Sequence, residues 1–326
     1  MIFDDVTTVI KLASYSGAGV CIGLGAIGAA LGEGYTAGLA SQSLSLKPEK
    51  SGDIMKNMLV GQAVAESAAI FALVIAILLL FRDTANDTSL LTAASLFGAG
   101  LCMGFGAIGS GIGSGFPGGE ACLGMSRQPE VTGRLTTNML IGSAVCQTPA
   151  IFSMVVSLML IFMGFEGKPL APTWAALLGA GISTGLAAVG SGFGGGLAAG
   201  ASCNSIARNP ETFGQVTTTM LVGQAVSQTP SIFGLLVSFI LMFASFPESA
   251  TLAAAMALLG AGISMGFGGL GPGIGNGFTA QGAVKWVARN MEAAGDLMRT
   301  MLVGQAVSQS TAIYAMVVSL VLIFVI

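Results

Sequence analysis

Two glutamates and a serine are the residues whose types and spacing could do chemistry. Glu33 and Glu66 lie within long apolar stretches, and Ser67 directly follows Glu66. A carboxylate inside a membrane costs several kcal/mol unless it is neutralised or paired, so it marks a functional site by default. Two carboxylates in contact in a low dielectric cannot both stay ionised, so one holds a proton or a cation sits between them. Such oxygen-rich surroundings suit a hard cation and predict an ion carrier.

The composition supports a membrane setting and excludes other chemistry. Of 326 residues, 53% are hydrophobic, 8% are charged and none is histidine. This profile is typical of an integral membrane protein. Five cysteines in apolar stretches suggest neither a metal cluster nor a disulfide framework. With 12 Lys+Arg against 15 Asp+Glu and no basic run, no nucleic acid is expected as a partner. Two aspartates near the start argue against a cleaved signal peptide.

A fourfold repeat supplies the elements that must position the glutamates. The strings GQAVAES, GSAVCQT, GQAVSQT and GQAVSQS begin at residues 61, 142, 223 and 304, a constant period of 81 residues. Each copy holds two apolar segments, and about 20 apolar residues span a bilayer as a helix. The sequence predicts an all-α transmembrane fold of eight helices in four tandem hairpins. The expected units are 1-86, which bears the carboxylates, 87-167, 168-248 and 249-326.

The two helices of each copy differ in composition. The first is dense in glycine, as in residues 98–119, and the second ends in large apolar residues, as in 151–162. Glycines let helix backbones approach closely in lipid. A dinucleotide-binding glycine loop is rejected, because these glycines run through a whole apolar helix with no preceding strand. We therefore expect an inner layer of first helices, an outer lipid-facing layer of second helices, and a ring.

Positive charge predicts the orientation. Nine Lys and Arg residues flank the polar turns and three lie at the opposite ends, which places the turns in the cytoplasm and both termini outside. The nine are Lys47, Lys50, Lys56, Arg127, Arg134, Arg208, Lys285, Arg289 and Arg299, and the three are Lys11, Arg82 and Lys168.

The hairpin geometry brings the two glutamates together. The midpoint between Glu33 and Glu66 falls in the Lys47–Lys50 turn. Folding there places both carboxylates at one depth, about 25 Å below the turn at 1.5 Å per residue.

The matching positions in the other copies have lost their acids. The Glu66 column continues as Gln147, Gln228 and Gln309, and the Glu33 column as Ser114, Gly195 and Asn276. Glutamine has the shape of glutamate but does not ionise. We expect one carrier site per chain. A third intramembrane acid, Glu120, has no matching carboxylate, so we expect it to snorkel or to face the ring's interior, with an auxiliary ion role as the alternative.

The glycine-rich first helix, the RQPE and RNPE turns, and GQAVAES on the second helix resemble the c subunit, or proteolipid, of rotary ATPases. The resemblance recurs in each of the four copies and so covers essentially the whole chain. It implies a homo-oligomeric rotor ring in lipid, a carboxylate at Glu66 that carries Na⁺ or H⁺ past the a subunit of the stator, and turns that grip the central stalk. The stalk-contacting residues would be Lys47, Glu49, Arg127, Glu130, Arg208, Glu211, Arg289 and Glu292. The turns resemble the F-type form, whereas fused hairpins with lost acids resemble the V-type.

The resemblance also implies a ligand set. Sodium-carrying relatives have Gln or Glu at the Glu33 position, a hydroxyl after Glu66 and a backbone carbonyl two residues before it, here Val64. Their supporting tyrosine would fall at Phe71, and only the fourth copy has one, Tyr314. This pattern favours Na⁺, with H⁺ as the alternative.

A neighbouring hairpin completes the site in such relatives. Thr148 with the Val145 carbonyl, or Ser310 with the Val307 carbonyl of an adjoining chain, are the two candidates. Pro149 and Pro230 would free the Val145 and Val226 carbonyls, or would merely kink their helices.

The function expected is ion translocation without catalysis. One carboxylate for four hairpins means few ions per turn of the ring, which favours an ATP-driven pump over a synthase. A passive pore is the competing class, although no selectivity filter is present. A secondary transporter is less favoured, because these repeats are parallel rather than inverted.

Overall fold

The computed structural model describes residues 6–84, 87, 89–165, 167–248 and 251–324. Over these residues the chain forms eight long helices. They pair as α1 (Val6–Leu46) with α2 (Ser51–Phe81), α3 (Leu90–Arg127) with α4 (Thr132–Phe162), α5 (Leu170–Arg208) with α6 (Phe213–Phe243), and α7 (Leu252–Val287) with α8 (Ala294–Phe324). All eight are long and apolar enough to cross a membrane. The predicted all-α transmembrane fold is confirmed, and the chain is an integral polytopic membrane protein.

The sequence predicts unit boundaries after residues 86, 167 and 248. The boundary after residue 167 lies between α4 and α5. The other two boundaries, after residues 86 and 248, cannot be placed in the same way, because residues 86 and 249 lie outside the described part of the chain.

Short turns join the two helices of each hairpin. In the first three hairpins a 3₁₀ turn begins at a proline, namely Pro48, Pro129 and Pro210. Proline fixes φ near the helical value and lacks the N–H that a turn start leaves unused. The fourth hairpin has Met291 in this column, and its turn begins with no 3₁₀ element.

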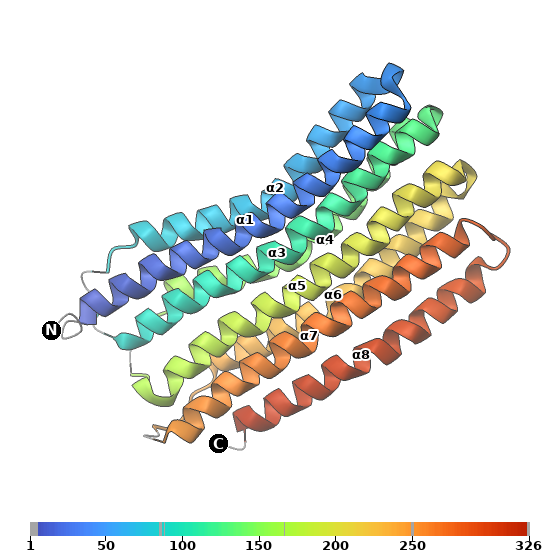
Figure 1. Cartoon of the computed structure of the whole chain (residues 1–326). Helices are drawn as coiled ribbons and strands as arrows, with labels where there is room; N and C mark the ends of the chain where they lie inside the picture. Colours follow the sequence, from blue (N-terminus) through green and yellow to red (C-terminus); the bar gives the residue numbers. More distant parts are fainter. Residues whose placement is uncertain (1–5, 85–86, 88, 166, 249–250, 325–326) are drawn as a thin grey trace.

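The glycine-rich helices form the tightly packed layer. Figure 1 shows α1, α3, α5 and α7 side by side, and each contacts the next. A Cβ on Gly100 would lie 2.2 Å from the carbonyl oxygen of Gly17, so glycine is required for this approach. Burial is greatest in α5, where 78% of the most apolar window is buried, and least in α8, where the share is 17%. The last hairpin therefore presents a largely open face.

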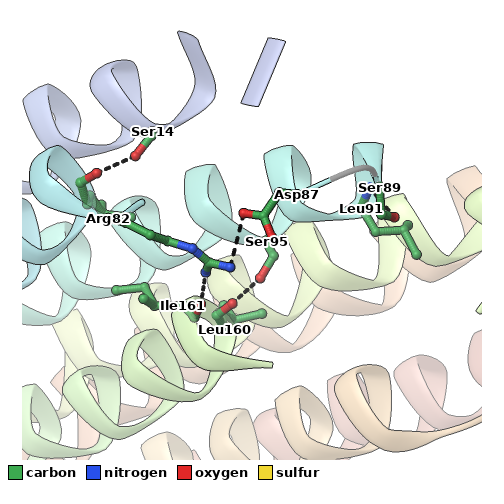
Figure 2. Close-up of polar contacts among 9 residues, drawn as sticks. Ser14, Arg82, Asp87, Ser89, Leu91, Ser95, Leu160 and Ile161 are labelled. Carbon is green, nitrogen blue, oxygen red and sulfur yellow. Dashed lines mark hydrogen bonds and ion pairs between the residues drawn. The ribbon is translucent and has the colours of Figure 1, made fainter. Parts of the chain in front are cut away.

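Two of the three cations distant from the turns have structural partners. Arg82 Nη1 donates to the Ile161 carbonyl near the end of α4, and Arg82 Nη2 lies 3.3 Å from Asp87 Oδ2 (Figure 2). Lys168 Nζ donates to the Met242 carbonyl near the end of α6 at 2.9 Å. Cations stabilise the C-terminal ends of helices, whose last carbonyls are unpaired. This role accounts for positive charge at this end of the molecule.

Serine hydroxyls bond helix backbones at the same end. Ser14 Oγ donates to the Leu79 carbonyl. Ser95 Oγ donates to the Leu160 carbonyl (Figure 2). Residues 14 and 95 occupy one column of the repeat, as do residues 79 and 160. The first two hairpins are therefore closed by the same contact.

Candidate cation site at the open edge of the chain

The structure brings the Glu33 and Glu66 columns together within the first, second and fourth hairpins. Gln147 Nε2 donates to Ser114 Oγ at 2.7 Å, and Asn276 Nδ2 donates to Gln309 Oε1 at 3.3 Å. In the first hairpin the same columns carry Glu33 and Glu66, whose carboxylates interact electrostatically. Gln62 Nε2 also donates to the Glu33 carbonyl at 3.3 Å, which ties the two helices together beside the pair.

Contacts between hairpins give the direction in which each site is completed. Gln147 Nε2 donates to the Val64 carbonyl of the preceding hairpin at 2.9 Å. Gln228 Nε2 donates to the Val145 carbonyl of the preceding hairpin at 2.8 Å. We call the contact between two neighbouring hairpins a joint. At both of these joints the residue in the Glu66 column therefore bonds the valine carbonyl of the preceding hairpin.

The same contacts place the predicted ligands. Ser67 Oγ donates to the Val64 carbonyl at 2.6 Å, so Ser67 and Val64 lie together at the joint with Gln147. The Val145 carbonyl, beside Thr148, faces Gln228. Ser310 Oγ donates to the Val307 carbonyl at 2.8 Å, and Val307 is 68% exposed at the far edge of the chain. The sequence offers two candidate ligand pairs from a neighbouring hairpin. Thr148 and Val145 are followed by the third hairpin of the same chain, whereas Ser310 and Val307 have no following hairpin in the chain.

Helical prolines free two of the joint carbonyls. Pro149 and Pro230 lie inside α4 and α6, four residues after Val145 and Val226. Each freed carbonyl accepts an amide from the next hairpin, because Gln228 bonds Val145 and Asn276 Nδ2 lies 3.4 Å from the Val226 oxygen. The prolines thus supply acceptors for the joints.

The first hairpin differs from the others at its outer edge. Glu66 is exposed and Glu33 is partly buried, whereas Gln147 in the Glu66 column is only 7% exposed. Among the described residues, no cluster of three or more His, Cys, Asp and Glu gathers in a metal-binding group. A cation would therefore need backbone and hydroxyl oxygens in addition to the two carboxylates.

Glu120 lies in a separate polar cluster on the first-helix layer. Its Oε1 accepts from the Tyr35 hydroxyl at 3.2 Å, and its Oε2 accepts from Asn204 Nδ2 at 2.6 Å. Arg208 Nε in turn donates to Asn204 Oδ1 at 2.9 Å. Tyr35, Asn204 and Lys285 help to line a cavity of about 240 Å³ beside Glu120. Sequence reasoning missed Tyr35 and Asn204, although both lie within about one helical turn of the Glu120 column in neighbouring hairpins.

The turn residues gather at one end of the molecule (Figure 1). Lys47 Nζ lies 3.4 Å from Glu49 Oε1, and a hydrogen bond from the backbone amide of Glu49, with help from Lys47, lowers the pKa of this carboxyl. Arg289 stacks on Trp286 at 4.6 Å. Neighbouring turns also touch, because Asn209 Nδ2 donates to the Ala288 carbonyl at 3.1 Å. The turns of the third and fourth hairpins are therefore in direct contact.

The fold and the site define a polytopic membrane protein of tandem helical hairpins, with the Glu33 and Glu66 carboxylates on the first hairpin, at the open edge of the chain. A family model that describes the C subunit of ATP synthase matches residues 16–79, 97–160, 178–241 and 259–322. The chain belongs to the ATP synthase C subunit family.

Individual relatives match one or more hairpins. The K subunit of an A-type ATP synthase from Methanocaldococcus jannaschii is 34% identical over 198 residues, which is 61% of this chain and 83% of the relative. The ATP synthase c subunit of Thermotoga petrophila is 46% identical over 81 residues, 25% of this chain and 93% of the relative. That of Alkaliphilus oremlandii is 50% identical over 70 residues, 22% of this chain and 78% of the relative. Both c subunit matches are no longer than one 81-residue repeat, which agrees with a c subunit made of fused repeats.

Proposed function

We propose that this chain is the rotor-ring subunit of an ATP-driven sodium pump, with one Na⁺ site per chain at the joint between adjoining chains. The family makes the chain a non-catalytic rotor subunit of a rotary ATPase. The cargo ion, the neighbouring ligands and the direction of transport are the parts that we add. Sidedness follows the charge bias, with the turns in the cytoplasm, facing the central stalk.

One observation carries the proposal. The chain has amide donors where its own hairpins meet, and carboxylates at the open edge of its first hairpin. At the first two joints a glutamine N–H bonds the valine carbonyl, and at the third Asn276 approaches the Val226 carbonyl. By the same register, Glu66 and Glu33 face the Val307 carbonyl of the adjoining chain. Two carboxylates and a carbonyl are all acceptors, so the joint needs a proton or a cation to hold it together.

Ligand count favours Na⁺ over H⁺ as the transported ion. A single shared proton would leave one negative charge in the membrane, which is costly, so the pair needs a second positive charge. A second proton or one Na⁺ brings the pair to zero charge. The Ser310 hydroxyl and the Val307 carbonyl, which lie within 2.8 Å of each other, add two neutral oxygens of the kind that hard cations prefer.

The low number of carboxylate pairs in the ring favours ATP-driven pumping over ATP synthesis. One pair per four hairpins gives a ring of ordinary circumference about a quarter of the ions per turn of a one-hairpin ring. Each charge crossing 100 mV supplies only about 2.3 kcal/mol. Few ions per turn therefore deliver little work for ATP synthesis, while ATP hydrolysis spread over few ions supports a steep gradient.

Carbodiimide labelling tests the site. A hydrophobic carbodiimide reacts with a protonated carboxyl, so the intact ring should give one adduct per chain, on Glu66, and Na⁺ should slow the reaction. Labelling that ignores Na⁺ but falls at high pH would move the cargo to H⁺. Glu66→Gln should assemble and lose both labelling and transport, because the chain already carries glutamine in this column three times. Transport that survives in Glu66→Gln would refute the site.

A further inference from the structure

The three joints inside the chain share one close backbone contact. A Cβ on Gly111 would lie 2.6 Å from the carbonyl carbon of Gly28. The equivalent distances are 2.6 Å from Gly192 to Gly109 and 2.5 Å from Gly273 to Gly190. Real Cβ atoms do not approach backbone atoms this closely, and a backbone cannot swing aside as a side chain does. These joints therefore exclude any side chain in this column.

The first hairpin departs from the rule. Residue 30 occupies this column, and it is alanine instead of glycine. Ala30 lies on the open edge of α1, which has no preceding hairpin within the chain. The carbonyl column that it would meet continues in the fourth hairpin as Gly271, and a Cβ there meets nothing within 4 Å.

A second copy of the chain fits between these two edges. Gly19 and Gly34 have open space at the first edge, whereas Gly100 and Gly115 in the same columns abut Gly17 and Gly32. Within the described part of the chain the amide of Gln62 bonds only Glu33, whereas Gln305 in its column bonds both Asn276 in its own hairpin and Gly223 in the preceding one. The vacant partner of Gln62 in an adjoining copy is Gly304. Head-to-tail contacts of this kind close into rings.

We propose that the methyl group of Ala30 wedges the joint between adjoining chains open, so that this joint alone is wider than the three within the chain. The inference rests on the homo-oligomeric ring of the proposed function. Ala30 precedes Glu33 by three residues, about 4.5 Å along the helix, so the widening lies at the depth of the carboxylates. Space for the ion is made where the acids are, and the amide-bonded joints stay closed.

Engineered cysteines first test that the two edges meet. Inside the chain, Thr136 Oγ1 lies 3.1 Å from Asn57 Oδ1 across a joint. The same columns at the two edges hold Met55 and Thr300. Oxidation of the double variant Met55→Cys and Thr300→Cys should link chains into a ladder. Thr136→Cys with Asn57→Cys should close within one chain, and the five native cysteines, all buried, should give no ladder. Absence of the ladder in a ring that stays assembled would overturn the proposal.

Removal of the wedge tests the widening. Ala30→Gly should let the joint between chains close to the spacing of the joints within the chain. The ring should then stay assembled in detergent at a higher temperature, and carbodiimide should label Glu66 several-fold more slowly. Gly192→Ala is the matched control at an interior joint, and it should weaken the chain while leaving Glu66 labelling unchanged. Unchanged labelling and unchanged ring stability in Ala30→Gly would overturn the wedge. Neither readout depends on the identity of the ion or on the direction of pumping, so the wedge can fail while the proposed function stands.

Discussion

Gln147 Nε2 donates to the carbonyl oxygen of Val64 at 2.9 Å, across the joint between the first two hairpins. Together with the bond from Gln228 to Val145, it shows that the Glu66 column packs against the carbonyl of the preceding hairpin within the chain. Under the proposed function, the amide N–H takes the place that a proton or cation would fill beside a carboxylate. The carboxylates of Glu33 and Glu66 lie on the hairpin that has no preceding hairpin within the chain.

Ser310 and Thr148 should differ in their effect on the ion, although they occupy one column. Ser310→Ala should remove a ligand from the joint between chains. Loss of one bond to a charged group costs about 1.5 kcal/mol, which is roughly tenfold in Kd. Thr148→Ala lies at an interior joint and should leave ion affinity unchanged. The concentration of Na⁺ that halves carbodiimide labelling measures both, and an equal effect of the two variants would contradict the assigned direction.

Gln147→Glu should create a second carboxylate in the Glu66 column, at the joint between the first two hairpins. The new carboxylate would face the Val64 carbonyl without an N–H to donate, and loss of a buried hydrogen bond costs about 1–3 kcal/mol. We expect a second carbodiimide adduct by mass mapping and lower resistance to detergent unfolding. Gln147→Ala is the control, because it loses the same bond and gains no acid. A destabilised Gln147→Glu chain with a single adduct would argue that interior joints cannot host the carrier chemistry.

Tyr35→Phe should affect stability but not transport. The variant removes the hydroxyl that donates to Glu120 at 3.2 Å and leaves Asn204 in place. One such bond contributes about 1 kcal/mol. Thermal unfolding of the assembled ring measures the loss, and Glu120→Gln should show a comparable small change with normal ion transport. Transport abolished by Glu120→Gln would assign this cluster an ion role that the carboxylate pair at Glu66 does not explain.

Vesicles that contain the whole complex decide the direction of work. With ATP supplied, the complex should accumulate Na⁺ to a steep gradient, since few ions share the energy of each turn. Under a physiological ion gradient without ATP it should make little ATP. The ring in the same preparation must be shown to contain only this chain, because added one-hairpin subunits would raise the ions per turn. Net synthesis from such a ring would refute the pump.

The sequence by itself determined the fold and the pairing of the acids. Apolar length specifies a spanning helix because lipid offers no partner to backbone groups, and the 81-residue period repeats the hairpin four times. The turn at Lys47–Lys50 and the equal distance of Glu33 and Glu66 from the middle of this turn follow from the chain alone, since a hairpin pairs residues symmetrically about its turn. The partners within each hairpin were therefore predictable.

Only the tertiary structure decided the contacts between hairpins. The period says that the copies are alike, but it does not say on which side the next copy packs, so Val307 and Val145 are equal candidates for Glu66 from the sequence. The bond from Gln147 to Val64 gives the packing direction of the first two hairpins, and the proposal of Val307 rests on it. Tyr35 and Asn204 were missed as partners of Glu120 for the same reason. Such contacts depend on the rotation and the offset of one packed helix against another, which close backbone packing at glycine sets and which hydropathy does not record.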